Sequence, residues 1–375
     1  MYISELNGLT KIDEFLDLYK GKKILLVTGK KSFEKSGAKI ILEQKLKNEC
    51  VDHFSDFSIN PKFDDAIRGA EIARLADSEI IIAVGGGSVL DMAKLIKAFI
   101  TSNPNDCLQM VEGKIPVIDC GIPLIGIPTT AGSGSEATHF AVVYVNSTKF
   151  SLASPSMIPN AVILDGLLSL STNNYQTACN ALDAMAQAIE SSWAISSTAE
   201  SRDYSFSALE KGWHLVPQMF NGDSREKYIQ QLLEAANLAG RAINISKTTA
   251  SHAWSYAFTT HYKIPHGHAV WLTLPAIFQS HITVADKDII DSRGVEYFRQ
   301  LMRRISNILD IKGNQKPEDI LKKFLDAIGI EHDFNILGLT STNQRKFIAS
   351  QLNMERMANH PVDLSIYIDK IFNIL

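Results

Sequence analysis

The segment EIIIAVGGGSVLDMAK, residues 79–94, decides the fold of the N-terminal half. Its apolar run over 79–87 predicts a buried strand, and the apolar spacing over 88–100 predicts a helix directly after it. Glycines at the junction let backbone N–H groups approach an anion, and the helix N-terminus adds a favourable dipole. The candidate phosphate-binding residues are Gly85, Gly86, Gly87, Ser88 and Asp91, with Ser88 as an alternative helix cap. A tight turn that binds nothing is the other interpretation of this segment.

The same alternation of short apolar runs and helical spacing continues on both sides of this segment. Strands are expected at 23–28, 51–57, 123–128, 140–145 and 161–165, and helices at 35–46 and 64–76. Buried strands interleaved with helices at this spacing predict βαβ units and a parallel sheet covered on both faces.

The pattern of apolar residues changes after about residue 170. Few β-branched runs remain, and helical spacing of apolar residues is found at 181–194, 202–216, 225–243 and 317–328. The sequence therefore predicts an α/β nucleotide-binding domain over 1–168 and an all-helical domain over 169–375.

Composition excludes several classes of protein. The chain has 375 residues, 45% of them hydrophobic, and a formal charge of −4, so most of it has the apolar material to fold. Nucleic-acid binding is disfavoured because no basic block is present, and the longest apolar runs fall short of the roughly 20 residues that span a bilayer. The four cysteines form no Cys-x-x-Cys pair, and the N-terminus lacks the pattern of a secretory signal. We expect a cytoplasmic protein.

A second loop, PTTAGSGSEAT at 128–138, follows the strand predicted at 123–128. Parallel sheets bind ligands at the carboxyl ends of their strands, so two adjacent loops of this kind could form one dinucleotide crevice. Thr129, Thr130 and Ser133 are the candidate hydroxyl contacts, unless they only satisfy the backbone of the loop in local turns.

A third group of residues lies in the helical half. Asp183 and Gln187 stand four apart in LDAMAQAIE and would share one helix face. His252 and His266 follow, fourteen residues apart, with His268 beside the second. A carboxylate and two imidazoles are typical ligands for a divalent first-row metal, although each of these residues alone is more often structural.

Taken together, GGGSVLDMAK, IPTTAGSGSEAT, LDAMAQAIE and the segment from His252 to IPHGH resemble the iron-containing (group III) alcohol dehydrogenase family over nearly the whole chain. The resemblance implies a Rossmann-like N-terminal domain that binds a nicotinamide cofactor, a helical C-terminal domain and an active site in the cleft between them. It also implies a homodimer or larger oligomer. The family's metal ligands correspond to Asp183, Gln187, His252 and His266.

Two positions depart from the family pattern. Gln187 replaces a histidine and offers a neutral amide oxygen, which makes the site harder. As a weak ligand, Gln187 favours Fe²⁺ or Mn²⁺ over Zn²⁺, with Fe²⁺ as the expected ion. The alternatives are three strong ligands with water in place of Gln187, and loss of the metal. Tyr256 stands where many members carry a histidine near the nicotinamide. It either donates a proton or shapes the pocket, and His268 is a second candidate for proton transfer.

The resemblance also bears on the choice of cofactor. Family members that prefer NAD tend to carry an acidic residue after the first strand, where this chain has Gly29 followed by Lys30. Without that carboxylate a 2′-phosphate is tolerated, and a nearby lysine would attract it, so we expect NADPH rather than NADH. Lys149 matches a family lysine near the cofactor.

The expected substrate is a short aldehyde with an anionic end. Arg241 and Lys247, the candidates for binding that end, precede His252, and on one continuous helix positions 241, 248, 249 and 252 would share a face. The combination of THFAVVYV, AQAIESSW, AGRAINISKTT and IPHGHAV is most similar to the branch of the family that reduces phosphonoacetaldehyde to 2-hydroxyethylphosphonate. His139 is a further candidate for contact with the oxyanion. Reduction of neutral short-chain aldehydes and a metal-free nucleotide-binding scaffold are the alternatives.

Overall fold

The computed structural model describes residues 1–19, 21–146, 148–222 and 225–374. Contacts divide the chain into two compact units. The N-terminal unit contains Met1–Thr172 and Ile229–Gly240, and the helical unit contains Asn173–Tyr228 and Arg241–Leu375. Helix α10 (Arg225–Ser246) contributes to both units.

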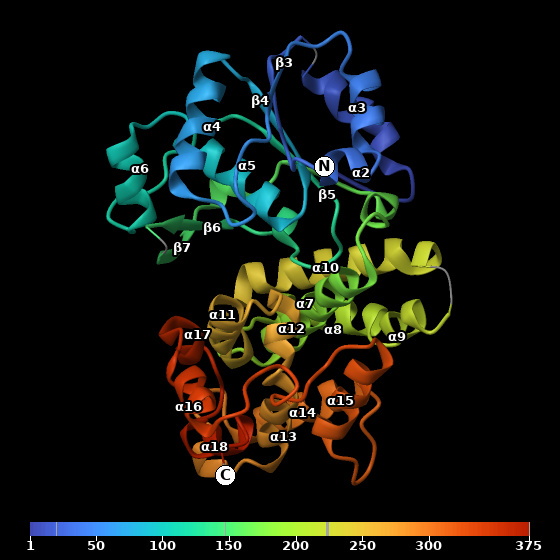
Figure 1. Ribbon diagram of the computed structural model, residues 1–375, viewed down its shortest axis with the longest axis vertical. Helices are drawn as coiled ribbons and strands as arrows, with labels where there is room; N and C mark the ends of the chain where they lie inside the picture. Colours follow the sequence, from blue (N-terminus) through green and yellow to red (C-terminus); the bar gives the residue numbers. More distant parts are fainter. Residues whose placement is uncertain (20, 147, 223–224, 375) are drawn as a thin grey trace. The chain divides into compact units, whose positions relative to one another are not determined.

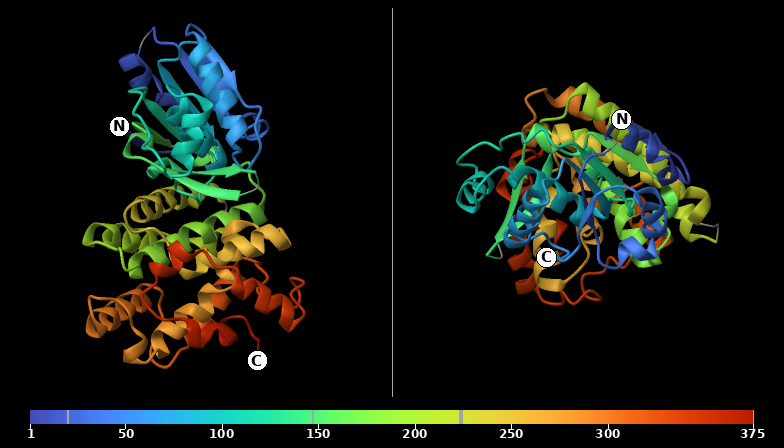
Figure 2. Two further views of the ribbon diagram at one scale, coloured as in Figure 1. Left: turned by 90° about the vertical axis from the view of Figure 1, so that its left-hand side faces the viewer. Right: turned by 90° about the horizontal axis from the view of Figure 1, so that it is seen from above.

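A six-stranded parallel sheet forms the centre of the N-terminal unit. Its strands, in spatial order, are β1 (Tyr2–Ser4), β8 (Ala161–Leu164), β5 (Leu124–Pro128), β4 (Ile80–Gly85), β2 (Ile24–Thr28) and β3 (Val51–Phe54). The helices of this unit are α1 (Asp13–Leu16), α2 (Ser32–Lys35), α3 (Ala38–Lys45), α4 (Phe63–Leu75), α5 (Gly87–Phe99) and α6 (Pro104–Val111). They cover both faces of the sheet (Figures 1 and 2).

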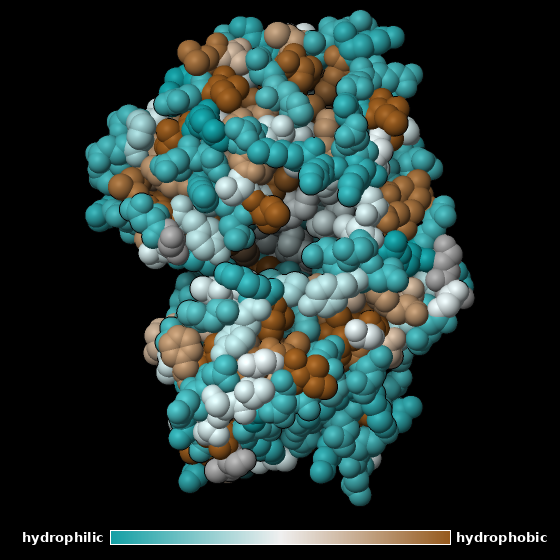
Figure 3. Space-filling view, in the orientation of Figure 1, coloured by the Kyte–Doolittle hydropathy of each residue, from teal (hydrophilic) through white to brown (hydrophobic). Residues whose placement is uncertain are grey.

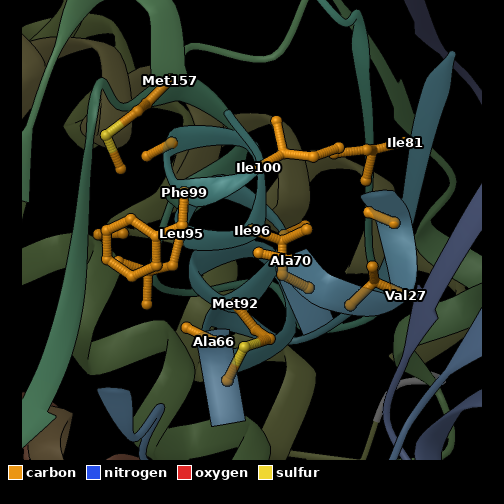
Figure 4. Close-up of a cluster of buried hydrophobic side chains, with 14 of the residues drawn as sticks. Val27, Ala66, Ala70, Ile81, Met92, Leu95, Ile96, Phe99, Ile100 and Met157 are labelled. Atoms are coloured by element: carbon orange, nitrogen blue, oxygen red, sulfur yellow. The ribbon is translucent and has the colours of Figure 1, made fainter. Parts of the chain in front are cut away.

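Alternation along the strands explains the two faces. Leu25 and Val27 of β2 join one apolar cluster with α4, α5 and α6, whereas Ile24 and Leu26 join a second cluster with α1, α2 and α3. Figure 4 shows the first cluster, in which Ile96 of α5 and Ile100 at its C-cap lie on the side of Val27 and Ile81. Both faces are buried, as expected for a parallel sheet.

Two predicted elements differ in detail. The strand at 140–145 is β6 (Phe140–Val145), which pairs antiparallel with β7 (Thr148–Ala153) in a separate hairpin. The helix predicted at 35–46 is interrupted, because Gly37 has φ +80° and separates α2 from α3. Glycine adopts this left-handed conformation without steric cost.

The regular elements of the helical unit are helices, and its one bridge pairs Ile289 with Val362 among the described residues. The helices are α7 (Asn174–Trp193), α8 (Ala199–Gly212), α9 (Leu215–Phe220), α11 (Ala250–Tyr262), α12 (His266–Trp271), α13 (Leu274–Thr283), α14 (Val295–Ile308), α15 (Pro317–Ala327), α16 (Thr342–Ser350), α17 (Met354–Ala358) and α18 (Ile368–Ile371). With the parallel sheet of the other unit, they confirm the predicted fold class.

The starts of these helices follow the sequence. Asn173 caps α7, Thr198 forms a capping box at α8, and Pro317 is the first residue of α15. None of the helices in the described part of the chain combines the length and apolar character that crossing a membrane requires. On the face drawn in Figure 3, apolar side chains are scattered among hydrophilic ones.

Candidate metal centre and cofactor loops

Three helices of the helical unit bring the predicted metal donors together. Asp183 and Gln187 lie one turn apart on α7, His252 is in the first turn of α11, and His266 is the first residue of α12. Figure 1 shows these three helices side by side. One donor atom from each of Asp183, His252 and His266 lies within 4.8 Å of the others, which is a grouping that could hold a metal ion.

The distances between the donors are slightly longer than those around a bound metal ion. Asp183 Oδ1 is 3.5 Å from His252 Nε2 and 3.7 Å from His266 Nε2. Two donors that each lie about 2.1 Å from one ion are separated by roughly 3.0 to 3.4 Å at octahedral or tetrahedral angles. Asp183 Oδ1 and His252 Nε2 are also buried atoms that make no hydrogen bond within the described structure. A metal ion would satisfy both of them.

Neighbouring groups set the direction of both imidazoles. His252 Nδ1 contacts the Glu190 carboxylate, and His266 Nδ1 lies 3.4 Å from Ser255 Oγ. The Ser255 hydroxyl donates to His252 O at 2.8 Å, so it is left to accept a proton from His266 Nδ1. In the neutral rings that bind a metal, these partners assign the N–H to Nδ1 and leave both Nε2 lone pairs for the ion.

The electrostatics of the site favour a cation. Burial lowers the pKa of His252, but the Glu190 and Asp183 carboxylates outweigh it and raise that pKa to about 9. Burial raises the pKa of Asp183, but His266 and His252 hold it below its usual value. Two buried carboxylates therefore stabilise positive charge where the Nε2 atoms meet.

Gly267 permits the close approach of α12 to α7. A Cβ atom at this position would lie 1.9 Å from Cys179 O and 2.8 Å from Asp183 N. Only glycine fits against the α7 backbone here, and its neighbour His266 is thereby held beside Asp183.

Gln187 is 4% exposed and lies on the same face of α7 as Asp183. Its amide oxygen could complete the donor set as a neutral ligand. Glu190, three residues further along that face, was missed by the sequence analysis. Its signal was its seven-residue spacing from Asp183, which is close to two helical turns.

The two candidates for proton transfer differ in their surroundings. The Tyr256 ring stacks on the His266 ring, with centroids 6.2 Å apart and planes inclined by 11°. His268 is 2% exposed, and its two nitrogens contact Tyr175 Oη at 2.9 Å and Glu331 O at 2.6 Å. Because both nitrogens of His268 are engaged, this residue is better explained as a link between helices than as a proton donor to substrate.

The predicted anion-binding loops are adjacent in the N-terminal unit. Gly85 ends β4 beside Pro128, which ends β5, and Thr129 N donates to Gly85 O at 3.0 Å. The chain order of the sheet reverses between β4 and β2, which is where open α/β sheets bind ligands. The Val89 side chain lies against the ends of both β2 and β4. A Cβ atom would lie 3.5 Å from Val89 Cγ2 if added at Gly29, which follows β2, and 2.4 Å from it if added at Gly85, which ends β4.

Close packing explains why two positions of this turn are occupied by glycine. A Cβ at Gly86 would lie 3.2 Å from Thr130 Oγ1, and a Cβ at Gly87 would lie 2.8 Å from Ser133 Oγ. The hydroxyls predicted to contact the cofactor thus lie against the glycine turn, in one composite surface of backbone N–H groups and hydroxyls.

The roles expected of Ser88 and Asp91 need correction. Gly86 occupies the N-cap of α5, so Ser88 lies in the first turn and does not cap the helix. Asp91 Oδ1 accepts from Ser135 Oγ at 2.6 Å, and Asp91 Oδ2 accepts from Val142 N at 3.0 Å. Both oxygens are occupied within the protein, so Asp91 organises the second loop.

Lys94, one turn after Asp91, was also missed. Its buried ammonium group donates to Ser135 Oγ, Thr138 Oγ1 and Phe140 O at 2.8 to 3.0 Å. Burial lowers the pKa of Lys94 to about 8, against the opposing carboxylates of Asp91 and Glu136. Three acceptors match its three protons, so Lys94 ties α5 to the end of the 128–138 loop.

The remaining predicted residues of the N-terminal unit lie at its edges. Lys30, next to Gly29, forms an ion pair with Asp56 at 2.5 Å. Lys149 is exposed in β7, opposite Tyr144 of β6. His139 directly precedes β6, and its ring packs edge-on against Phe140.

The single helical face expected for residues 241–252 is not present. Helix α10 ends at Ser246 and α11 begins at Ala250, because Lys247 takes a left-handed conformation with φ +58°. The Lys247 ammonium group pairs with Glu355, and Thr249 Oγ1 donates to Glu190. The continuous helical face on which the prediction for Lys247 rested is therefore absent. Arg241 is on α10, where its guanidinium lies 5.9 Å from the Tyr204 ring centroid.

Comparison with known proteins agrees with this architecture. A family model described as "Iron-containing alcohol dehydrogenase" matches residues 1–166, and one described as "Fe-containing alcohol dehydrogenase family, C-terminal" matches residues 177–375. The chain belongs to the iron-containing alcohol dehydrogenase family.

Two relatives are about one-third identical to this chain over the parts that align. A phosphonoacetaldehyde reductase of Streptomyces viridochromogenes is 31% identical over 236 residues, which span 61% of this chain and 60% of the relative. A protein described as "Probable alcohol dehydrogenase EutG" of Escherichia coli is 32% identical over 303 residues, 79% of this chain and 73% of the relative.

A solved structure supports the fold over the whole chain. The sulfoacetaldehyde reductase of Bifidobacterium kashiwanohense, solved with NAD⁺, superposes with a TM-score of 0.86 at 24% identity and covers 100% of this chain and 96% of its own.

Proposed function

We propose that this protein is a metal-dependent, NAD(P)H-linked reductase of a short anionic aldehyde, with phosphonoacetaldehyde as the preferred substrate. The observation that carries the proposal is the group of Asp183, His252 and His266, in which the two Nε2 atoms converge on the buried Asp183 Oδ1 at 3.5 and 3.7 Å. The matched part of the Streptomyces relative, a phosphonoacetaldehyde reductase by name, supports the choice of substrate.

Each group of residues has a distinct role in the proposed reaction. Asp183, Gln187, His252 and His266 hold a divalent ion, with Fe²⁺ or Mn²⁺ favoured over Zn²⁺ because an amide oxygen is a hard ligand. Such an ion supplies a Lewis acid that polarises the carbonyl oxygen of the aldehyde. The glycine turn at 85–88, together with Thr129, Thr130 and Ser133, binds the pyrophosphate of the cofactor and orients the nicotinamide for hydride transfer.

Arg241 and Tyr256 complete the proposed substrate site. The Arg241 guanidinium binds the phosphonate through two parallel hydrogen bonds, and this orients the carbonyl carbon. The Tyr256 phenol, stacked on His266, passes a proton to the alkoxide directly or through water.

The proposal is tested by following the oxidation of NADPH and NADH with phosphonoacetaldehyde and with butyraldehyde, after anaerobic addition of Fe²⁺. We expect the anionic aldehyde to be turned over with the higher kcat/KM. Equal or better use of butyraldehyde would favour the alternative, a reductase for neutral short-chain aldehydes. Absence of bound metal and of turnover with either aldehyde would favour a nucleotide-binding scaffold.

Arg241→Ala separates substrate binding from chemistry. We expect it to raise the KM for phosphonoacetaldehyde at least about tenfold and to leave the KM for butyraldehyde unchanged. Lys247→Ala is the matched control, because Lys247 is paired with Glu355 and should affect neither KM. Equal losses on both aldehydes in Arg241→Ala would remove Arg241 from the substrate site.

The preference for NADPH is tested at Lys30. A 2′-phosphate would compete with Asp56 for its ammonium group, so Lys30→Ala should raise the KM for NADPH several-fold and spare that for NADH. An unchanged ratio of the two KM values would contradict this role of Lys30.

A further inference from the structure

We propose that Glu190 is a positioning residue of the metal centre, which holds His252 in the orientation and tautomer that a metal needs. The inference rests on the proposed function, because it assumes that a divalent ion binds between Asp183, His252 and His266. Glu190 is fully buried on α7, three residues after Gln187.

The hydrogen bonds around Glu190 leave only one arrangement of protons for a neutral His252 ring. Its Oε1 accepts from Thr249 Oγ1 at 2.8 Å and from Ser251 N at 2.7 Å, and its Oε2 contacts His252 Nδ1. An ionised carboxylate only accepts hydrogen bonds, so His252 must carry its proton on Nδ1. In the neutral ring that binds a metal, the lone pair of Nε2 then faces Asp183.

A second bond fixes the direction of this network. Trp193 Nε1, which can only donate, lies 2.9 Å from Thr249 Oγ1. The Thr249 hydroxyl therefore accepts from Trp193 and has to direct its own proton to Glu190. Trp193, Thr249 and Glu190 are all completely buried, which keeps water from competing for these bonds.

The negative charge of the Glu190 carboxylate also has to be stabilised by positive charge at the metal centre. Within the described residues, Glu190 forms its ion pair with His252. A fully buried carboxylate is costly without a compensating positive charge. A divalent ion on the other side of the imidazole would supply it, so Glu190 and the metal should stabilise each other through His252.

Glu190→Gln is the most informative change, because it keeps the size of the side chain but introduces two N–H donors. If the amide nitrogen faces His252, the imidazole must move its proton to Nε2 and lose the lone pair aimed at the metal. If it faces Thr249 and Ser251, it meets two groups that already donate. Loss of outer-sphere partners of this kind typically weakens metal binding about 10- to 100-fold.

The experiment uses Co²⁺ as a probe whose visible spectrum reports its coordination. The Kd for Co²⁺ is measured by chelator competition, with the visible spectrum of the bound ion and the thermal midpoint of the metal-free protein, for the wild type, Glu190→Gln, Glu190→Asp and Ser191→Ala. Ser191 is the matched control: it is fully buried on the same helix and bonds to Ser205.

We expect Glu190→Gln to raise the Kd for Co²⁺ about 10- to 100-fold and to alter the spectrum, while Ser191→Ala leaves both unchanged. Glu190→Asp should restore part of the affinity, because it keeps the charge. A Kd within twofold of the wild type and an unchanged spectrum in Glu190→Gln would overturn the role of Glu190 and leave the proposed function intact. Failure of the wild type to bind Co²⁺ would overturn both.

Should Glu190→Gln fail to fold, Thr249→Val replaces it, since it removes one donor to Glu190 and keeps the volume of the side chain. A several-fold rise in the Kd for Co²⁺ would support the network, and an unchanged Kd and spectrum would contradict it.

Discussion

The loops proposed to bind the cofactor in the N-terminal unit consist largely of backbone, whereas the proposed metal donors of the helical unit are side chains from three helices. The loops come from two short stretches, 85–88 and 128–138, that follow neighbouring strands. The donors extend from Asp183 to His266 and depend on the packing of α12 against α7. A site made of backbone should tolerate changes that alter its shape slightly, and a site made of a few side chains should fail when one of them is lost.

The largest effect is expected from Asp183→Asn, which removes the carboxylate at the centre of the donor group. We expect bound metal to be lost and kcat to fall at least about 1000-fold, the equivalent of about 4 kcal/mol. Metal analysis and initial rates measure this, and the Kd for NADPH should stay within twofold of the wild type. Near-normal turnover would overturn the metal assignment.

Gly267→Ala tests how far the donors depend on helix packing. The added methyl group would lie 1.9 Å from Cys179 O, a backbone atom that cannot rotate away. We expect the free energy of unfolding to fall by about 3 kcal/mol and metal binding to weaken, because α12 is displaced with His266. Denaturant unfolding with and without Co²⁺ measures both. Wild-type stability would show that α12 can shift without cost.

Acid should destabilise the helical unit. His281 and His360 are fully buried with their Nε2 atoms 2.9 Å apart. Burial lowers the pKa of His360 to about 4, although Glu190 opposes this, and burial with His360 nearby lowers the pKa of His281 well below 6.5. Protons therefore bind the unfolded chain more readily, and stability is lost as the pH falls from about 6.5 towards 4, by at most about 1.4 kcal/mol per pH unit for each histidine.

Urea unfolding at pH 7.5, 6 and 5, followed by tryptophan fluorescence, checks this prediction. His360→Asn should reduce the loss of stability between pH 6.5 and 5, whereas replacement of the exposed His214 should leave the loss unchanged. A profile in His360→Asn that matches the wild type would contradict the assignment.

The smallest effect is expected from Gly87→Ala, which makes the same chemical change as Gly267→Ala in the other unit. Its Cβ would meet Ser133 Oγ at 2.8 Å, and a hydroxyl can rotate away. We expect the Kd for NADPH to rise about tenfold, with metal content and stability close to the wild type. Fluorescence titration measures the Kd. A loss of stability as large as that in Gly267→Ala would remove the proposed difference between the two sites.

The sequence by itself determined the class of fold, the two glycine loops and the four candidate metal donors. Strands, helices and loops leave local patterns, because burial imposes a period of two or 3.6 on neighbouring residues. The donors at 183 and 187 share a face of one helix for the same reason. The histidines were assigned through the family resemblance, since no local pattern connects positions 183 and 266.

Only the tertiary structure decided what the polar side chains contact. Asp91 and Lys94 hold a loop, Lys247 ends a helix and pairs with Glu355, and both nitrogens of His268 are occupied. Glu190 is the partner of His252, although the two residues are 62 positions apart in the sequence. A hydrogen bond depends on positions to within a few tenths of an ångström, and those positions are set when distant helices pack.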